Sequence, residues 1–377
     1  MRAAVIERAG EPVRVEELTL DPPRRGEVRV RMLASGVCHS DLHVRDGDWE
    51  RPGPIVLGHE GAGIVEDVGE GVDVPRVGQL VALTWYAPCR HCIHCLAGRE
   101  WLCNDSPSLQ HRMADGTTRL HRSDGSEILA YLSIGTFAEA QVVPATAAIP
   151  MPDGIDPAAA ALIGCCVSTG VGAALKTAEL RPGATVLVLG LGGVGLSVVM
   201  GAMLAGAAQI VAVDRVQAKL DLAGELGATD TILAATDRNE TLQAIRDVTS
   251  GGPDVAFEAI GRGETIELAV EAVPPGGTAV LVGLTPFGTR ASFDVFPFVD
   301  GSRRIIGSNY GYAVASVDFP RYAALHLEGR LPIERLIDRR IGLDGIEEAL
   351  DRMRNGEGLR SVVSFDDGAS ARGQAAI

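Results

Sequence analysis

Short runs of β-forming residues, separated by Gly and Pro, fill the chain up to about residue 160. Clear examples are the runs 27–33, 63–68 and 79–83. Runs of this length with Gly and Pro between them are typical of antiparallel β structure. We therefore predict a mostly antiparallel, barrel-like first domain with few long helices.

The pattern changes at about residue 167, where apolar runs begin to alternate with helical stretches such as 217–226. The apolar runs are 185–189, 209–213, 254–258 and 278–282. This alternation predicts an α/β domain built on a doubly wound parallel sheet. After about residue 310 the mixed polar pattern returns, which indicates that the chain rejoins the first domain.

Chain length supports this division, because 377 residues exceed what one hydrophobic core usually holds. The predicted domains are 1–166 together with 310–377, and 167–309. Segment 104–125 is rich in Asp, Ser, Arg and Gly and has little periodicity, so we predict a long loop there.

Composition excludes several classes of protein. Hydrophobic residues make up 46% and charged residues 22%, which is ordinary globular usage and excludes a disordered or fibrous chain. A net charge of −15 without a basic cluster disfavours nucleic acid and anionic membranes as partners. The N-terminus lacks the apolar core of a signal peptide, and apolar runs such as 186–189 are too short to span a bilayer. We expect a cytoplasmic protein.

The seven cysteines are clustered. Four fall between Cys89 and Cys103, Cys165 and Cys166 are adjacent, and Cys38 stands alone. In a reducing compartment this grouping favours metal binding over disulfides.

A glycine-rich turn follows the run 185–189 and opens a predicted helix. Its glycines are Gly190, Gly192, Gly193 and Gly195, and the spacing Gly-x-Gly-x-x-Gly is that of a dinucleotide-binding turn. Without side chains the backbone can approach a pyrophosphate, which then lies at a helix N-terminus. A glycine-rich turn without a ligand is the alternative.

Asp214 strengthens the nucleotide interpretation, because it ends the next β-run about 20 residues later. A carboxylate there accepts both ribose hydroxyls of the adenosine and repels a 2′-phosphate. The sequence therefore favours NAD over NADP. Arg215 is the opposing residue, since a cation beside the ribose tolerates a phosphate.

Cys89, Cys92, Cys95 and Cys103 have the spacing C-x2-C-x2-C-x7-C. Four thiolates surround zinc completely and leave no position for a substrate, so we predict a structural zinc. The alternative of four unrelated thiols is remote for this spacing. His91 and His94 are alternative ligands, although a complete cysteine set makes them solvated neighbours.

Cys38, His59 and Cys165 are the remaining candidates for a second, open zinc site of the Cys₂His type. Sequence distance alone does not join them. On spacing alone, small buried cysteines and a satisfied histidine in the turn LGHEGAG are the simpler interpretation.

Successive motifs of the chain resemble the zinc-containing medium-chain alcohol dehydrogenases, in particular their animal-type, long-loop branch. The motifs are GVCHSDLH, GHEGAGIV, the four-cysteine segment, LIGCCVSTGVGA, GLGGVG and LRSVVSF. The resemblance covers essentially the whole chain and keeps the motif order. It implies a Rossmann NAD-binding domain plus a GroES-like catalytic domain that carries a zinc lobe.

The resemblance assigns roles around a catalytic zinc. It makes Cys38, His59 and Cys165 the ligands, with Glu60 beside the metal and Asp41 orienting a ligating histidine. Ser40 takes the alcohol proton, and His43 receives it through the nicotinamide ribose and passes it to solvent. Zinc polarises the alcohol oxygen, and hydride passes to the nicotinamide. The implied cofactors are NAD and two zinc ions per chain, one catalytic and one structural.

Further positions match the family's cofactor and substrate contacts. The nicotinamide side of the cofactor corresponds to Thr169, Val194 and Val282, the adenosine ribose to Lys219, and the pyrophosphate to Arg360. The substrate pocket corresponds to Trp49, Trp85, Tyr131 and Leu284.

Three positions depart from the family pattern. His39 stands where many members carry an arginine for the pyrophosphate, so we expect weaker phosphate binding and faster cofactor release. Cys166 replaces a usual glycine, an exchange for which we have no physical account. Pro107 lies where thiol-adduct formaldehyde dehydrogenases place an arginine for the adduct's carboxylate, which disfavours a glutathione adduct as substrate.

The function expected from these residues is reversible hydride transfer between NAD and a small-molecule alcohol or aldehyde. The alcohol is expected to be primary, with aromatic and medium-chain alcohols as candidates. A thiol-dependent formaldehyde dehydrogenase and an enzyme that keeps NAD permanently bound are alternatives. A zinc-stabilised NAD-binding protein without turnover is a third class, which the three surviving ligands disfavour. The long loop 104–125 resembles dimeric family members, so we expect a homodimer.

Overall fold

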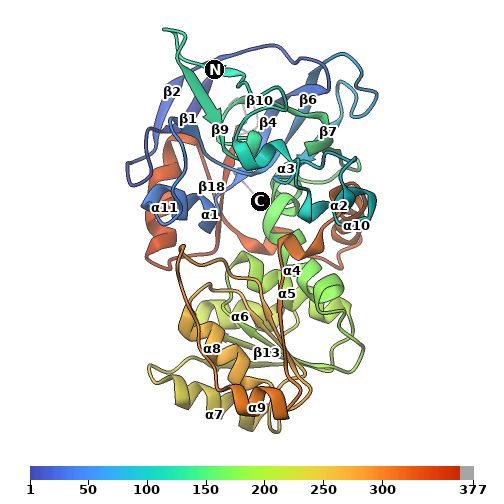
Figure 1. The fold of residues 1–377 in the computed structure, drawn as a ribbon, viewed down its shortest axis with the longest axis vertical. Coiled ribbons are helices and arrows are strands. Elements are labelled where there is room, and N and C mark those ends of the chain that lie inside the picture. Colours follow the sequence, from blue (N-terminus) through green and yellow to red (C-terminus); the bar gives the residue numbers. More distant parts are fainter. Residues whose placement is uncertain (366–377) are drawn as a thin grey trace, which may run out of the picture. The chain divides into compact units, whose positions relative to one another are not determined.

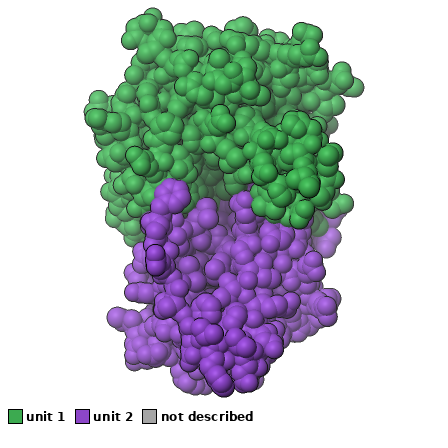
Figure 2. Space-filling model, in the orientation of Figure 1, with its two compact units in different colours: residues 1–165, 315–327, 333–377 green, residues 166–314, 328–332 purple. Residues whose placement is uncertain are grey.

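The computed structural model describes residues 1–365, which form parts of two compact units (Figure 2). Unit 1 contains Met1–Cys165, Ala315–Leu327 and Ile333–Ile377, and unit 2 contains Cys166–Val314 and Glu328–Pro332. Of the expected return segment 310–377, residues 366–377 lie outside the described residues.

Unit 1 is built on two mainly antiparallel sheets (Figure 1). A seven-stranded sheet has the order β11-β7-β6-β4-β19-β18, with β10 also paired to β4. The bounds of its strands are β4 Glu27–Gly36, β6 Glu60–Val68, β7 Leu80–Leu83, β10 Ala140–Pro144, β11 Ala148–Pro150, β18 Ile337–Ile341 and β19 Arg360–Ser364.

The second sheet of unit 1 has six short strands in the order β2-β1-β5-β9-β8-β3. Their bounds are β1 Arg2–Ile6, β2 Arg14–Glu17, β3 Thr19–Leu20, β5 Ile55–Val56, β8 Leu120–His121 and β9 Glu127–Ala130. The helices of unit 1 are α1 His39–Asp46, α2 Ile93–Leu96, α3 Pro157–Leu162, α10 Ala315–Leu327 and α11 Ile346–Arg354. The mostly antiparallel character predicted for this part of the chain is confirmed.

Alternation of apolar side chains explains the long central strands of unit 1. In β4, Val28, Val30 and Met32 are fully buried, whereas Arg29 and Arg31 between them pair with Glu66 on β6. Period-two burial of this kind places one face of a strand in the core. The buried residues of β4 pack with Val65 and Val81 of β6 and β7 in one core cluster.

Unit 2 contains a six-stranded, all-parallel sheet in the order β14-β13-β12-β15-β16-β17, which is the doubly wound arrangement. The strands are β12 Thr185–Leu189, β13 Gln209–Asp214, β14 Asp230–Leu233, β15 Val255–Glu258, β16 Thr278–Leu281 and β17 Arg304–Gly307. The helices are α4 Ser168–Gly172, α5 Gly193–Leu204, α6 Gln217–Glu225, α7 Arg238–Val248, α8 Gly263–Ala272 and α9 Val295–Asp300. The predicted parallel sheet is confirmed.

One apolar helical segment is longer than the sequence interpretation allowed. Pro157–Thr177 is 21 residues long and apolar enough that, by length and composition, it could span a bilayer. The expectation that apolar runs are too short to do so was therefore wrong. In an 18-residue window of this segment, 89% is buried within the protein, as in a core helix.

Candidate functional site

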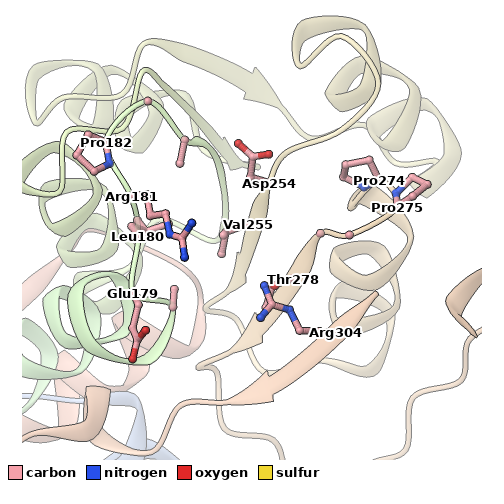
Figure 3. A pocket seen from close by; sticks show the side chains of 15 residues that line it. Glu179, Leu180, Arg181, Pro182, Asp254, Val255, Pro274, Pro275, Thr278 and Arg304 are labelled. Atoms are coloured by element: carbon pink, nitrogen blue, oxygen red, sulfur yellow. The ribbon is translucent and has the colours of Figure 1, made fainter. Parts of the chain in front are cut away.

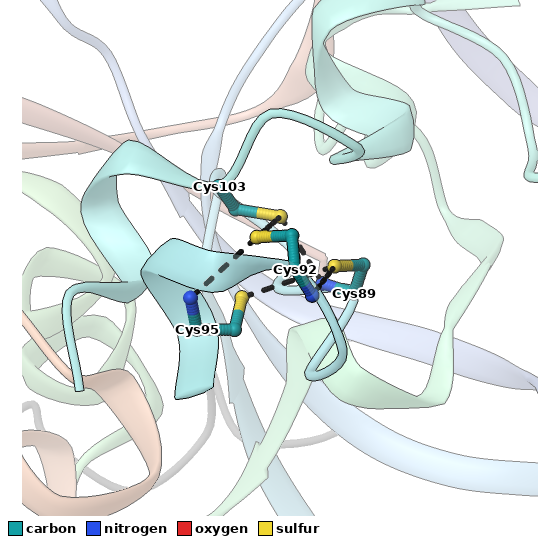
Figure 4. A group of neighbouring side chains, drawn as sticks. All are labelled: Cys89, Cys92, Cys95 and Cys103. Atoms are coloured by element: carbon teal, nitrogen blue, oxygen red, sulfur yellow. Dashed lines mark hydrogen bonds between the residues drawn. The ribbon is translucent and has the colours of Figure 1, made fainter. Parts of the chain in front are cut away.

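The four-cysteine segment forms one compact cluster in unit 1 (Figure 4). Its four sulfurs lie within 4.8 Å of one another. The Cys89 and Cys95 sulfurs are 3.9 Å apart, and those of Cys92 and Cys103 are 4.0 Å apart. Zinc–sulfur bonds of about 2.3 Å in a tetrahedron require sulfurs about 3.8 Å apart. The cluster therefore fits a zinc ion with four thiolate ligands.

Backbone N–H groups donate to three of these sulfurs, whereas burial raises the pKa of the Cys95 and Cys103 thiols. The Cys92 N–H donates to the Cys89 sulfur over 3.3 Å, and the Cys89 N–H donates to the Cys103 sulfur over 3.3 Å. A hydrogen bond from the Cys95 N–H lowers the pKa of the Cys92 thiol to about 6. Hydrogen bonds to a thiolate favour the ionised form that binds metal.

The two histidines of this segment do not belong to the four-sulfur set. His91 is exposed, and its Nδ1 lies 3.9 Å from a carboxylate oxygen of Asp105. Together with Cys89 these two residues form a looser group of potential ligands. A complete four-thiolate set needs neither histidine, so the expectation that they are neighbours stays the simpler one.

A second group of potential ligands consists of Cys38, His59, Glu60 and Cys165, all of them buried. Strand pairing explains half of this assembly. Gly36 at the end of β4 pairs with Glu60 at the start of β6, so Cys38 and His59 follow and precede neighbouring strands. Cys165 comes from a π-helical turn, Ile163–Val167, of a kind often found at functional sites. The structure thus joins the three residues that spacing alone left separate.

Asp41 orients the histidine of this group. One carboxylate oxygen lies 3.2 Å from Nδ1 of His59 and accepts the Gly58 N–H over 3.0 Å. The other accepts the Cys38 N–H over 3.1 Å. Because a carboxylate only accepts, Nδ1 carries the hydrogen and Nε2 presents its lone pair. Nε2 is buried without a hydrogen-bond partner among the described residues, as a metal ligand requires.

Electrostatics around the group favour a thiolate at Cys38. A hydrogen bond from Cys165 lowers the pKa of the Cys38 thiol well below its usual range, and the charges of Arg360 and His59 add to this effect. Burial raises the pKa of Glu60 to about 8, against the opposing charge of Arg360. Two thiol sulfurs, an imidazole nitrogen and a nearby carboxyl form a donor set suited to zinc.

The proton-relay candidates lie on one helix. Cys38 is the N-cap of α1, and Ser40 and His43 follow within it. Ser40 and His43 are partly buried, whereas His39 is exposed and its ring lies 5.8 Å from that of His43. The predicted succession of ligand, hydroxyl and imidazole on one short segment is therefore present.

Two of the expected pocket residues take specific positions in unit 1. Tyr131 is buried, and its ring lies 5.7 Å from His59. Trp49 is buried and stacks on His43 with ring centroids 4.6 Å apart. Trp85 is partly buried and lies against Tyr86, whereas Leu284 belongs to unit 2 and is exposed.

His111 is a residue that sequence reasoning missed. It is buried, its ring lies 5.5 Å from that of Tyr131, and its Nδ1 accepts the Leu132 N–H over 3.0 Å. Burial, with the charge of Arg51, lowers the pKa of His111 to about 4. A histidine in a predicted loop gave no signal of burial, so the sequence offered no way to find it.

The glycine turn of unit 2 has the shape of a phosphate cradle. Gly190 has a φ of +88°, and a Cβ on Gly195 would lie 1.7 Å from the Gly190 carbonyl oxygen. A Cβ on Gly192, by contrast, would meet no atom within 4 Å. Gly190 and Gly195 are required by the turn itself, while the space beside Gly192 suits a ligand at the start of α5.

Asp214 lies at the carboxyl end of β13, next to this turn. Its carboxylate accepts the Leu191 N–H over 2.8 Å and the Val216 N–H over 3.0 Å. The carboxylate is therefore held beside the glycines. The other expected cofactor contacts in unit 2 are Gly193 at the start of α5, the partly buried Thr169, Val194 and Lys219, and the buried Val282.

Arg360 was predicted to bind the pyrophosphate, and in the structure it faces the ligand group of unit 1. Its Nη2 lies 3.2 Å from Oε1 of Glu60, and its Nη1 donates to the Val37 carbonyl over 2.7 Å. A contact with pyrophosphate stays a prediction.

A pocket of about 610 Å³ in unit 2 lies at the opposite end of the strands (Figure 3). Residues before β12 and at the amino ends of β15, β16 and β17 line it, among them Arg181, Asp254, Thr278 and Arg304. Open α/β sheets bind ligands at the carboxyl ends of their strands. This pocket is therefore separate from the glycine turn.

Comparisons with known proteins agree with this geometry. Residues 24–153 match the family described as alcohol dehydrogenase GroES-like domain, and residues 193–327 match that described as zinc-binding dehydrogenase. The chain is 36% identical over 368 residues to an S-(hydroxymethyl)glutathione dehydrogenase from Synechocystis sp., covering 97% of this chain and 99% of the relative.

Two solved structures are also similar. An alcohol dehydrogenase zinc-binding domain protein from Burkholderia ambifaria is 36% identical, with a TM-score of 0.92 over 97% of this chain and 99% of that one. Benzyl alcohol dehydrogenase from Acinetobacter calcoaceticus is 30% identical, with a TM-score of 0.88 and the same coverage. The chain therefore belongs to the zinc-containing medium-chain alcohol dehydrogenase family, an oxidoreductase family with a GroES-like and a Rossmann domain.

Proposed function

We propose that this chain catalyses reversible hydride transfer between a small alcohol and NAD. Residues 1–166 and 310–377 form the proposed catalytic domain, and residues 167–309 form the proposed NAD-binding domain. The observation that carries the proposal is the buried group of Cys38, His59 and Cys165, in which Asp41 leaves Nε2 of His59 free to bind metal. When bound, zinc supplies Lewis-acid polarisation of the alcohol oxygen, and NAD supplies the hydride acceptor.

The chain's own residues do the remaining work. Cys38, His59 and Cys165 would hold the metal, and Glu60 belongs to the same buried group. The Ser40 hydroxyl accepts the alcohol proton, and His43 passes that proton to solvent. Burial of the ligand group excludes water and strengthens each electrostatic interaction within it.

NAD is the proposed cofactor because of the Asp214 carboxylate beside the glycine turn. Two backbone N–H groups orient this carboxylate, so its oxygens are positioned for ribose hydroxyls. A 2′-phosphate brought to the same place would meet a negative charge.

Metal analysis tests the proposal directly. We expect two zinc ions per chain in wild type, and one in Cys38→Ala, which should fold but not reduce NAD. Cys166→Ala is the matched control, because Cys166 is buried next to Cys165 but lies outside the ligand group. Fully active wild-type protein with one zinc or none would overturn the assignment.

A thiol-dependent formaldehyde dehydrogenase is the second candidate function. It is favoured by the 36% identity to an S-(hydroxymethyl)glutathione dehydrogenase and disfavoured by Pro107. The two are separated by measuring NAD reduction with primary, secondary, aromatic and terpenoid alcohols, and with formaldehyde, each with and without glutathione. A strict requirement for the thiol would replace our proposal with this one. Recording the absorbance of purified protein beforehand tests for permanently bound NAD.

We further propose a homodimer formed through the end of the unit 2 sheet. Strand β17 is the last strand of its sheet, and large apolar side chains are exposed nearby in sequence: Phe287, Val295, Phe296 and Val299. An exposed last strand with apolar neighbours favours pairing with a second copy. Light scattering should give twice the chain mass, and a tetramer or monomer would reject the proposal.

A cytoplasmic location stays a prediction.

A further inference from the structure

We infer that Asp48 is a positioning residue that fixes the tautomer of His43 and so sets how well this histidine takes protons. The inference rests on the proposed proton relay and extends it by one residue that no motif pointed to. Asp48 follows the relay helix α1 and lies five residues after His43.

The carboxylate reaches the imidazole because the chain reverses after α1. Gly47 caps the helix with a φ of 84° and a ψ of 6°, a left-handed conformation that glycine adopts without strain. The reversal places Oδ2 of Asp48 at 2.7 Å from Nδ1 of His43. The Trp49 N–H also donates to the His43 carbonyl over 3.2 Å. The turn is therefore hydrogen-bonded to both the side chain and the backbone of His43.

The plane of the imidazole is held as well. Trp49 stacks on it with an interplanar angle of 27°, and the guanidinium carbon of Arg51 lies 5.9 Å from the Trp49 ring. His39 approaches its edge, with an interplanar angle of 61°. A ring held on its face and at Nδ1 keeps one orientation through a reaction cycle.

The hydrogen bond determines which nitrogen can act as a base. A carboxylate only accepts hydrogen bonds, so the neutral imidazole carries its hydrogen on Nδ1 and its lone pair on Nε2. A proton that arrives from the alcohol therefore binds Nε2 and gives an imidazolium paired with Asp48. The proton then leaves Nε2 for solvent.

Asp48 is the carboxylate that acts on this ring, although α1 contacts other charged groups. Asp46 pairs with Arg354, and Asp351 and Glu347 of α11 pair with Arg45. The other ionisable side chains near the ring are His39, whose ring lies at its edge, and Arg51, whose guanidinium lies over the Trp49 ring. These other acids are therefore engaged by arginines, while Asp48 is hydrogen-bonded to His43.

The pair is too exposed to serve mainly as a structural contact. The Asp48 side chain is 41% exposed and that of His43 15% exposed. Exposed ion pairs contribute little to folding. Replacing Asp48 should therefore affect proton transfer far more than folding stability. The same solvent exposure allows the proton to pass to water.

The test uses Asp48→Asn, His43→Gln and the double variant in the zinc-loaded enzyme with NAD. Hydride transfer is measured in single turnover from pH 5 to 9, at low and high concentrations of a buffer base. Asparagine can donate to Nδ1 and so favour the tautomer whose Nε2 carries the hydrogen. Loss of a positioned general base costs roughly 100-fold or more, so a misoriented one should cost about three- to tenfold at pH 7.

Two further results are expected. Asp48→Asn should respond to added buffer base, as His43→Gln does, because an external base then replaces the relay. Adding Asp48→Asn to His43→Gln should change nothing more. Asp46→Asn is the control on the same helix and should leave the profile unchanged, because its carboxylate pairs with Arg354.

Each outcome has a distinct meaning. If His43→Gln keeps the wild-type rate and profile, the relay itself is wrong and this inference falls with it. If His43→Gln slows the reaction but Asp48→Asn does not, only the role of Asp48 is overturned. If Asp48→Asn slows the reaction as much in the His43→Gln variant as in wild type, Asp48 does not act through His43. That result also overturns the inference. Thermal unfolding midpoint and zinc content, measured for every variant, exclude a folding defect. Should Asp48→Asn misfold, Asp48→Glu serves in its place and should keep a low response to buffer.

Discussion

The buried side chains of Glu60 and Arg360 are in contact, with Nη2 of Arg360 at 3.2 Å from Oε1 of Glu60. The same guanidinium donates to the carbonyl of Val37, the residue before Cys38. Arg360 thus connects the backbone next to the ligand Cys38 with the carboxyl group of Glu60, which follows the ligand His59. Space for this carboxylate exists because residue 36 is glycine, on which a Cβ would lie 2.2 Å from Oε2 of Glu60.

Arg360→Lys should weaken zinc binding at the open site. A lysine ammonium cannot reach both acceptors in the planar geometry of a guanidinium. Loss of such outer contacts costs metal affinity about 10- to 100-fold, which is the loss we expect. Zinc release to a coloured chelator should become faster for one of the two ions only. Unchanged release of both would show that the pair does not support the site.

Asp214→Ala should shift cofactor preference from NAD toward NADP. The carboxylate that repels a 2′-phosphate is lost, and so is the acceptor of the Leu191 and Val216 N–H groups. We expect kcat/KM for NAD to fall about tenfold or more, and that for NADP to rise, because ribose recognition is lost. Steady-state kinetics with both cofactors measures this.

Asp221→Ala is the matched control for this change. Its carboxylate is on the next helix and accepts a hydrogen bond from Gln217. Asp221→Ala should leave the preference between NAD and NADP unchanged. A wild-type enzyme that already prefers NADP would contradict the role of Asp214.

Ser40→Ala should reduce alcohol oxidation far more than His43→Gln does. Ser40 lies two residues after the N-cap Cys38 on α1, and it is the hydroxyl proposed to take the first proton. We expect a loss of about 100-fold or more in hydride transfer, the range for a lost proton-transfer group. Ser40→Thr, which keeps a hydroxyl, should retain much of the rate. Equal activity of the alanine and threonine variants would show that no hydroxyl is needed here.

His111→Asn should make the protein less sensitive to acid. Burial lowers the pKa of His111 to about 4, below the value of about 6.5 for an unfolded chain. Between these values the unfolded state binds the extra proton, so stability falls as pH decreases from about 6.5 to 4. The shift corresponds to roughly 3 kcal/mol over the whole window.

Asparagine suits this position, because residue 111 has a φ of 58° and accepts the Leu132 N–H. The variant should keep the fold and lose the titrating group. Apparent thermal midpoints at pH 7 and pH 5 should converge relative to wild type. His91→Asn, which changes an exposed histidine, should leave the pH dependence as it is. A wild-type slope in His111→Asn would mean that another group controls acid stability.

Local sequence patterns predicted much of the secondary structure of this protein and two of its motifs. Alternating burial in β4 and the β-α-β succession of unit 2 follow from the periodicity of apolar residues, because each period matches one backbone geometry. The four-cysteine cluster and the glycine turn were also predictable. Their residues lie within short segments, so spacing along the chain constrains spacing in the fold.

Tertiary structure alone decided which distant residues meet. Cys38, His59 and Cys165 are brought together by the pairing of β4 with β6 and by a π-helical turn, neither of which leaves a local signature. The pairing of Asp48 with His43 depends on a chain reversal at Gly47, and the burial of His111 depends on the packing of a loop. Periodicity reports which face of an element is apolar. It does not report which elements lie against that face, because long-range contacts are chosen by the packing of the whole chain.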